Sequence, residues 1–96
     1  MTPPFAVQTT SHYERLSNKL FKSHRDFKDA ELSAKEVLSA DPYNQTRRYH
    51  IKKLESVPAG DGQYRIRSGR FRFRYDISDQ VVYLKACSLR REDTYR

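Results

Sequence analysis

The feature that most constrains the fold is the stretch at residues 63–77, in which apolar and basic side chains alternate. Alternation with a period of two is typical of β-strands, whose successive side chains point to opposite faces of a sheet. A turn at Gly69 would let the two halves pair as a hairpin. One face would then carry Asp76 and four guanidinium groups, which we call the arginine face: Arg65, Arg67, Arg72 and Arg74. Because like charges side by side on a sheet repel each other, we interpret this face as a surface that binds a polyanion.

The net charge of +7 is confined to the second half of the chain. Residues 1–46 contain six Lys or Arg and six Asp or Glu, whereas residues 47–96 contain thirteen and six. Tyr and Phe lie among the basic residues, and nucleic acids offer phosphates to the charges and base faces to the rings. The second half therefore predicts a nucleic-acid-binding surface on a scaffold made by the first half. A basic, solvated surface without a specific partner is the alternative.

The first half of the chain predicts one strand and two helices. Residues 5–9 have the composition of a short strand, and Ser11 with Glu14 forms a capping-box pattern that starts a helix. Asp26 is the expected N-cap of a second helix, which Asp41-Pro42 would end. We expect an antiparallel helical hairpin that covers the apolar face of the later strands. Its two apolar stripes would be Tyr13, Leu16, Leu20 and Phe21, and Phe27, Ala30, Ala34, Val37 and Leu38.

Two further strands complete the predicted sheet. Residues 47–55 could form a strand with Tyr49, Ile51 and Lys53 on one side, and a loop follows at residues 58–62. Residues 81–87 would form the last strand, with Val82, Leu84 and Ala86 facing the core and Tyr83 and Lys85 joining the basic face. The expected fold is α+β, with the elements in the order β-α-α-β-β-β. An N-terminal strand and a helical hairpin would pack on one face of a small antiparallel sheet, as a single domain spanning residues 1–96.

The cysteine and histidine content argues against disulfides and metal sites. Cys87 is the only cysteine, and His12, His24 and His50 are too scattered for a metal-ligand motif. We therefore expect no metal and no cofactor. No apolar run is long enough to cross a membrane, and residues 1–10 lack the features of a signal peptide. The chain is expected to be cytoplasmic, with no membrane partner.

Three motifs, in the predicted order of elements, resemble a known family. They are a Tyr-basic-Ile-basic run at residues 64–67 followed by Gly69, an aromatic-Arg-x-x-Tyr run at residues 71–75, and Arg-Arg-x-Asp-x-Tyr-Arg at residues 90–96. In order and spacing they are similar to the RelE/ParE superfamily of toxins from bacterial and archaeal toxin–antitoxin pairs. The resemblance implies a type II toxin with a RelE-like fold and a cognate antitoxin as its partner.

The two branches of this superfamily differ in side chains rather than in fold. RelE-type members are endoribonucleases that enter the ribosomal A site and cleave mRNA there, whereas ParE-type members poison DNA gyrase. This chain has counterparts of all the basic and tyrosine residues that form the catalytic site of RelE-type members. Their presence favours a ribosome-dependent mRNA endoribonuclease that inhibits translation. The implied partners are then the 70S ribosome and mRNA. A ParE-like, non-nucleolytic toxin that acts on gyrase through its basic face is the alternative.

By position, the resemblance implies a catalytic set made of Arg65, Arg67, Arg72, Arg91 or its neighbour Arg90, and Tyr95. In the implied reaction the mRNA 2′-OH attacks the neighbouring phosphate, which leaves a 2′,3′-cyclic phosphate and a 5′-OH. Arg72 would stabilise the phosphorane, because a planar guanidinium fits phosphate oxygens. Arg91 would lie near the leaving group, and Tyr95 would stack on a base or hold the 2′-OH region. Each arginine could instead anchor a phosphate or form a surface ion pair, and Tyr95 could plug the core.

The proton acceptor is the open position in this set. RelE itself has lysines where this chain has Arg65 and Arg67, and an arginine, whose pKa exceeds about 12, is a poor general base. His50 and Lys52 are the candidates, since an imidazole titrates near neutral pH. Further side chains are expected to bind RNA without taking part in the chemistry: Lys52, Lys53, Arg74, Tyr83, Lys85 and Arg90.

Overall fold

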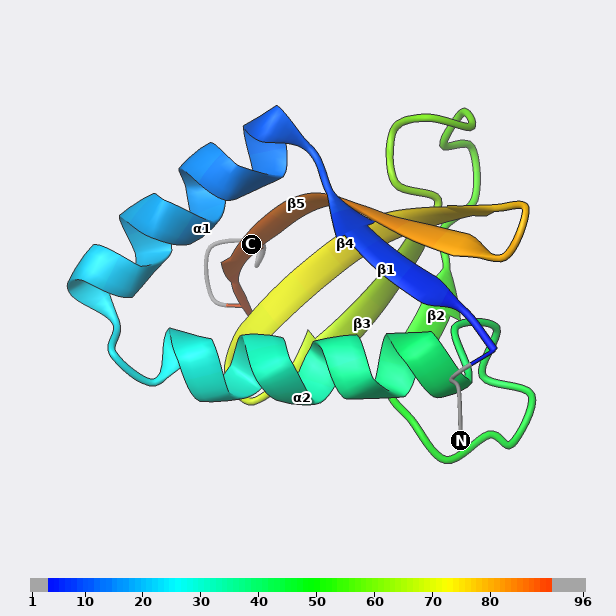
Figure 1. Ribbon diagram of the computed structural model, residues 1–96, viewed down its shortest axis with the longest axis horizontal. Coiled ribbons are helices and arrows are strands. Elements are labelled where there is room, and N and C mark those ends of the chain that lie inside the picture. The colour runs from blue at the N-terminus through cyan, green and yellow to red at the C-terminus, as the bar shows by residue number, and fades with distance from the viewer. Residues whose placement is uncertain (1–3, 91–96) are drawn as a thin grey trace.

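Two helices and a five-stranded sheet make up the computed structural model, which describes residues 4–90 (Figure 1). The elements follow in the order β1 (Ala6–Thr9), α1 (Ser11–Ser23), α2 (Phe27–Ala40), β2 (Ile51–Lys53), β3 (Tyr64–Ser68), β4 (Phe71–Ser78) and β5 (Val81–Leu89). The strands lie in the order β1-β5-β4-β3-β2. This arrangement confirms the predicted α+β fold with a helical pair and a meander, and the meander has four strands, one more than the predicted order β-α-α-β-β-β.

The sheet is mixed rather than wholly antiparallel. β1 pairs parallel with β5, whereas β2, β3, β4 and β5 pair antiparallel in sequence order. Short turns force neighbouring strands to run antiparallel, but a strand that reaches the sheet through a long crossover is free to pair parallel. Both helices and three strands separate β1 from β5, and this connection accounts for the parallel pair.

The first helix begins one residue earlier than the capping-box pattern indicated. Thr10 is the N-cap, and its hydroxyl oxygen accepts a hydrogen bond from the Tyr13 amide at 3.3 Å. The same hydroxyl donates to the Leu84 carbonyl of β5 at 3.0 Å. Threonine and serine are both good N-caps, so the expected cap at Ser11 was wrong by one position. The bond to Leu84 fixes the start of α1 against β5.

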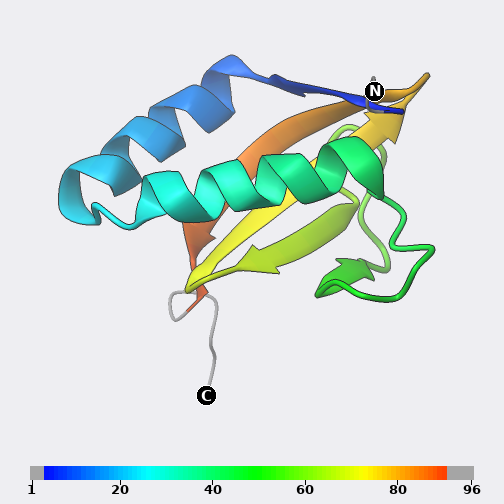
Figure 2. The ribbon, with the colours of Figure 1, turned by 60° about the horizontal axis from the view of Figure 1, so that its bottom comes forward.

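The two helices form an open V instead of a closely packed hairpin (Figures 1 and 2). α2 crosses the apolar face of the sheet and contacts β1, β3 and β4, while α1 packs mainly along β5. β1 covers the edge of β5 only from Val81 to Leu84. The rest of that edge has no strand beside it among residues 4–90, and α1, which follows β1 directly, lies against it.

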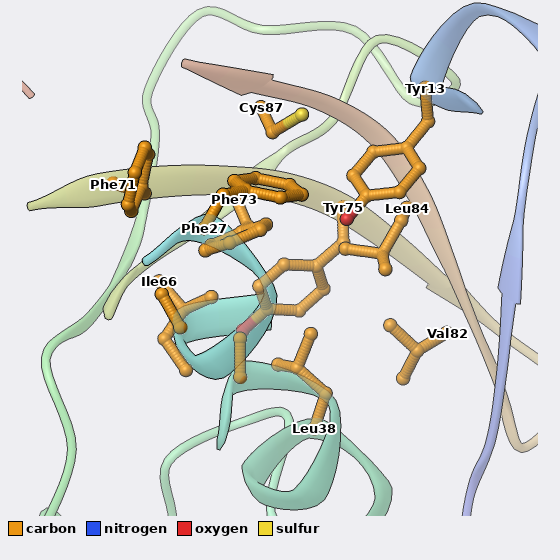
Figure 3. Close-up of a cluster of buried hydrophobic side chains, with 12 residues drawn as sticks. Tyr13, Phe27, Leu38, Ile66, Phe71, Phe73, Tyr75, Val82, Leu84 and Cys87 are labelled. Atoms are coloured by element: carbon orange, nitrogen blue, oxygen red, sulfur yellow. The ribbon is translucent and has the colours of Figure 1, made fainter. Parts of the chain in front are cut away.

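The core lies between α2 and the sheet (Figure 3). The predicted apolar face is confirmed, because Ile66, Phe71, Phe73 and Tyr75 are all buried. The Tyr75 hydroxyl donates to the Pro42 carbonyl at 2.7 Å, so its one buried polar group is satisfied. The other buried apolar residues are Tyr13, Phe27, Ala30, Ala34, Leu38, Val82, Leu84 and Cys87.

A bulge in β5 changes which residues face the core. Arg74 lies opposite Ala86, and between this pair and the next one β5 has an extra residue, Lys85. Beyond the bulge Cys87 is buried, and Ala86 shares the face of Arg74. The prediction that Ala86 faces the core was wrong, because it assumed regular alternation through the whole strand.

The second strand is shorter than residues 47–55. Asn44 and Arg47 have positive φ angles of 57° and 59°, and the Asn44 side chain donates to and accepts from the backbone of Tyr49. This loop leaves only Ile51–Lys53 to pair with β3. Asparagine tolerates the left-handed region and readily bonds to nearby backbone. The loop that Asn44 stabilises therefore replaces the first part of the predicted strand.

Cys87 provides a test of the packing beside α1. Burial raises the pKa of its thiol to about 12, and the carboxylates of Glu31 and Glu14 act in the same direction. The folded protein should therefore keep Cys87 protonated at pH 8 and react with iodoacetamide at least about a hundredfold more slowly than the protein in denaturant. A mass-spectrometric time course of alkylation measures this ratio. Equal rates in the two states would contradict the burial of Cys87.

Candidate nucleic-acid interface

The arginine face forms as the sequence predicted and spans three strands. Arg65 lies opposite Arg74, and Arg67 lies opposite Arg72, across the β3–β4 pair. Lys52 of β2 lies opposite Arg65 and extends the row to the sheet edge. Residues opposite each other on neighbouring strands are close and share a face. Five cationic side chains are thus held side by side on the face away from α2.

The arginine side chains are half-buried, not fully extended into solvent. The Nε atoms of Arg65, Arg67 and Arg72 are shielded from solvent, which means that their aliphatic stems pack against the sheet. Such packing restricts the guanidinium groups to few positions. A phosphate that binds here would meet donors that are already oriented.

The guanidinium of Arg74 bonds to the backbone of a neighbouring loop. Its Nε and Nη2 atoms donate to the Gly62 carbonyl at 3.1 and 3.0 Å, and Nη2 also donates to the Asp61 carbonyl at 3.0 Å. Both carbonyls belong to the loop at residues 54–63, which joins β2 to β3. Arg74 therefore holds this loop in place, and its role as an RNA contact remains a prediction.

Asp76 fixes the same loop from the other side. Its buried carboxylate accepts from the Gly62 amide at 3.0 Å and from the Gln63 amide at 2.9 Å. Gly62 has φ +82°, and a Cβ there would lie 3.0 Å from the Arg74 Cβ, so this position requires glycine. With both oxygens bonded to backbone amides, we do not assign Asp76 as the proton acceptor.

Three adjoining hollows form one groove along β5, which we call the β5 groove. The central hollow, about 440 Å³, has Arg65, Arg72 and Arg74 on one side and Leu16 of α1 on the other. The small side chains of Ala86 and Ser88 face it from β5 and leave it open. The groove therefore runs between α1 and the arginine face.

The two ends of the β5 groove carry further charged groups. At one end a hollow of about 670 Å³ lies between α1 and the 54–63 loop, and His12, Asp61 and Lys85 line it. At the other end a hollow of about 240 Å³ is lined by Lys19 of α1 and by Ser88. Along its whole length the groove is lined by more cationic than anionic side chains. An excess of positive charge along a groove is the feature by which proteins follow the backbone of a single-stranded nucleic acid.

The remaining predicted site residues do not all lie on the arginine face. Tyr83 lies opposite Asp76, on the arginine face. Lys53 lies on the opposite face, where its Nζ is 5.7 Å from the centre of the Tyr64 ring. Arg90 donates through its amide to the Arg70 carbonyl, at the β3–β4 turn.

The two candidate bases both lie on the β2 side of the arginine face. His50 is exposed, and its carbonyl accepts from the Arg67 amide at 3.1 Å. Lys52 is also exposed and lies opposite Arg65. The predicted residues Arg91 and Tyr95 lie outside the described residues.

The sequence did not assign the residues by which α1 forms one wall of the groove. His12, Leu16 and Lys19 line its three hollows in turn. Their spacing of four and three residues is the signal that could have revealed them, since it places all three on one helix face.

An ion pair joins the two turns at the end of the molecule opposite the 54–63 loop. Arg70 donates to both carboxylate oxygens of Asp26 at 2.9 Å, and its Nη2 lies 3.1 Å from His24 Nδ1. The hydrogen bond from Arg70 holds the pKa of Asp26 below its usual value. Asp26 is thus at the N-cap position of α2, as predicted, but its side chain makes no capping bond.

Residues 4–90 contain neither a helix able to cross a membrane nor a cluster of three or more residues suited to hold a metal ion.

No model of a known protein family matches the chain, and no curated protein matches it. Solved structures do match. An archaeal RelE–RelB complex from Pyrococcus horikoshii OT3 superposes with a TM-score of 0.64 over 91% of this chain and 96% of that chain, at 23% identity.

A second match extends the comparison. The RelB–RelE antitoxin–toxin complex from Methanococcus jannaschii has a TM-score of 0.60 and 16% identity, and covers 88% of this chain and 92% of that chain. The chain has the RelE fold. This finding confirms the fold that the motifs at residues 64–67 and 71–75 implied. At these identities the likeness concerns the fold alone.

Proposed function

We propose that this protein is the toxin of a type II toxin–antitoxin pair and that it cleaves mRNA on the ribosome. The observation that carries the proposal is the row of half-buried arginines that forms one side of the β5 groove on a RelE fold. A scaffold without a polyanionic partner would gain nothing from this repulsive arrangement. Because ribosome-bound mRNA is the proposed substrate, the cytoplasm is the proposed site of action.

In this proposal the members of the arginine face have separate roles. Arg72 stabilises the charge of the phosphorane, since it lies in the central hollow with its stem packed and its guanidinium oriented. Arg65 and Arg67 anchor the flanking phosphates. Arg91 and Tyr95 act at the leaving group and at the base, as the family resemblance implies.

The proton acceptor of the proposed site has two candidates. No arginine can serve, and Asp76 is bonded to the 54–63 loop. His50 and Lys52 remain the candidates, and both are exposed at the sheet edge. Neither candidate base lines the central hollow with Arg72, so in this proposal the ribosome orients the 2′-OH.

Ribosome dependence is the direct test of the proposal. Expression of the protein should arrest growth, and primer extension on a reporter mRNA should map cuts within codons. Purified protein should cleave the same RNA at least about a hundredfold more slowly without ribosomes, because the 2′-OH then lacks its orienting partner. Efficient cleavage of naked RNA would contradict ribosome dependence. Growth arrest with intact mRNA and inhibited gyrase would favour the ParE-like function instead.

A cognate antitoxin is the proposed protein partner. The solved RelE-fold structures described above are complexes with RelB, and an acidic segment would relieve the repulsion among the arginines of the groove. We expect the dissociation constant for the antitoxin to rise by roughly tenfold or more between 0.05 and 0.5 M salt, because ions screen exposed charge pairs. Isothermal titration at several salt concentrations measures it.

A variant controls for where the antitoxin binds. Arg67→Gln removes one charge from the arginine face, and it should weaken binding at low salt and flatten the salt dependence. A dissociation constant that is independent of salt in the unmodified protein would place the contact on an apolar surface away from the arginine face.

A further inference from the structure

The helix α1 carries a row of cationic side chains that extends beyond the proposed cleavage site. Arg15 and Lys22 are exposed, and Lys19 lies between them in sequence and is exposed as well. The spacing of four and three residues aligns all three along the helix. The one acidic residue of α1, Glu14, accepts a hydrogen bond from the Thr9 hydroxyl. α1 thus presents an almost purely positive row to solvent.

Within the part of the chain that the structure describes, these charges are not balanced. In residues 4–90, no carboxylate lies within ion-pair distance of Arg15, Lys19 or Lys22. On α2, by contrast, Lys28 and Lys35 both pair with Glu31. The unbalanced charge of α1 is therefore available to an outside partner.

The row extends outward from the β5 groove. Lys19 lines the groove, whereas Arg15 and Lys22 are each three residues from a groove residue, His12 and Lys19 respectively. Three residues turn an α-helix by about 300°, so both side chains are rotated about 60° from the groove-facing side. Because α1 lies at the rim of the molecule (Figure 1), these two cations point to a surface next to the groove.

We infer that α1 is a second phosphate-binding surface, which docks on the backbone of double-helical RNA while the β5 groove holds a single strand. The inference rests on the proposed function, in which structured ribosomal RNA would surround the bound mRNA. Duplex RNA suits a helix rim that offers only charge, since phosphate contacts need cations and hydrogen-bond donors but no apolar anchor.

The distribution of apolar side chains favours RNA over an acidic protein or a membrane. Leu16, Leu20 and Phe21 of α1 are partly buried against the core. The large apolar residues that are exposed within residues 4–90, Leu32 and Tyr43, lie outside α1. A membrane-bound helix inserts apolar side chains between lipids, and a peptide that docks on a helix uses apolar anchors. The cationic row of α1 offers neither partner such a contact.

The test compares two variants that each lose two positive charges. Arg15→Gln/Lys22→Gln changes the outer side of α1, and Arg47→Gln/Arg48→Gln changes exposed positions elsewhere. The full chain is titrated against a labelled, blunt-ended RNA duplex of about 20 base pairs between 0.05 and 0.3 M salt, and circular dichroism checks that each variant is folded. Each lost phosphate contact should lower the salt slope by roughly 0.7–0.9.

The α1 variant should therefore bind the duplex at least about tenfold more weakly near 0.1 M salt, with a slope reduced by roughly 1.5, while the control variant binds as the unmodified protein does. Duplex binding needs no cleavage, so this result would stand even if the chain proved not to be a nuclease. Unchanged duplex affinity in the α1 variant, or an equal loss in the control, would overturn the inference. The inference would also be overturned if the α1 variant lost binding to phosphatidylserine vesicles, titrated in parallel, and kept its affinity for the duplex.

Discussion

Replacing Arg72 by alanine should reduce mRNA cleavage by at least about 10²-fold and remove toxicity while the protein stays folded. Removal of a single donor that stabilises transition-state charge costs roughly 10²–10³ in rate. Arg72 lies in the central hollow of the β5 groove and directly opposite Arg67. The change loses the packing of the Arg72 stem but also relieves like-charge repulsion across the β3–β4 pair, so the protein should stay folded.

Two variants control the Arg72 experiment. Arg72→Lys keeps the charge but loses the planar fork, so it should recover only part of the rate if bidentate phosphate binding matters. Arg47→Ala removes an exposed cation outside the sheet and should cleave normally. Primer extension gives the cleavage rate, and thermal denaturation gives the stability of each variant. Retained toxicity of Arg72→Ala at normal protein levels would remove Arg72 from the site.

The two faces of the sheet followed directly from the sequence. Alternation at residues 63–77 specified which side chains meet, because a strand has a strict period of two and a short turn at Gly69 fixes the register. Arg65 and Arg67 therefore lie opposite Arg74 and Arg72 as expected. The same rule failed in β5, where one extra residue, Lys85, reverses the faces beyond the bulge. A bulge leaves no mark in a pattern of single residues.

The wall of the groove formed by α1 could not be predicted from local patterns. The apolar stripe of α1 shows that the helix has a buried side, but not which surface buries it. That depends on β1 pairing with only half of β5, which leaves an edge that the helix covers. This is a long-range contact between the two ends of the chain. The groove-lining roles of His12 and Lys19 follow from it.

The environment of Arg74 depends on backbone atoms, so it could not be predicted from the sequence either. In sequence Arg74 looks like Arg72, two residues earlier in the same strand. In the fold, the carbonyls of Asp61 and Gly62 accept from Arg74, and the central hollow receives Arg72. Only the path of the 54–63 loop distinguishes Arg74, which bonds to the loop backbone, from Arg72. The glycine at position 62 is the single sequence signal of that close approach.

Asp76→Ala should lower the free energy of unfolding by roughly 3 kcal/mol, because it removes two hydrogen bonds to a charged acceptor and leaves the buried Gly62 amide unsatisfied. The 54–63 loop should become more mobile at the same time, since among residues 4–90 Arg74 would be the remaining side chain from outside the loop that bonds to it. Urea denaturation measures the stability, and limited proteolysis within residues 54–63 measures the release of the loop. Glu55→Ala, an exposed change in the same loop, should leave both unchanged.

The effect on activity separates the loop from the arginine face. The 54–63 loop forms one wall of the β5 groove at the end where His12 and Lys85 lie, and the arginines at the centre do not depend on it for their position in the strands. Asp76→Ala should therefore weaken RNA binding while Arg72 still supports cleavage of bound RNA. The stability of Asp76→Asn, whose amide oxygen can still accept one hydrogen bond, should lie between that of Asp76→Ala and that of the unmodified protein. If Asp76→Ala unfolds at the same urea concentration as the unmodified protein, the carboxylate does not hold the loop, and the wall of the groove must be maintained by Arg74.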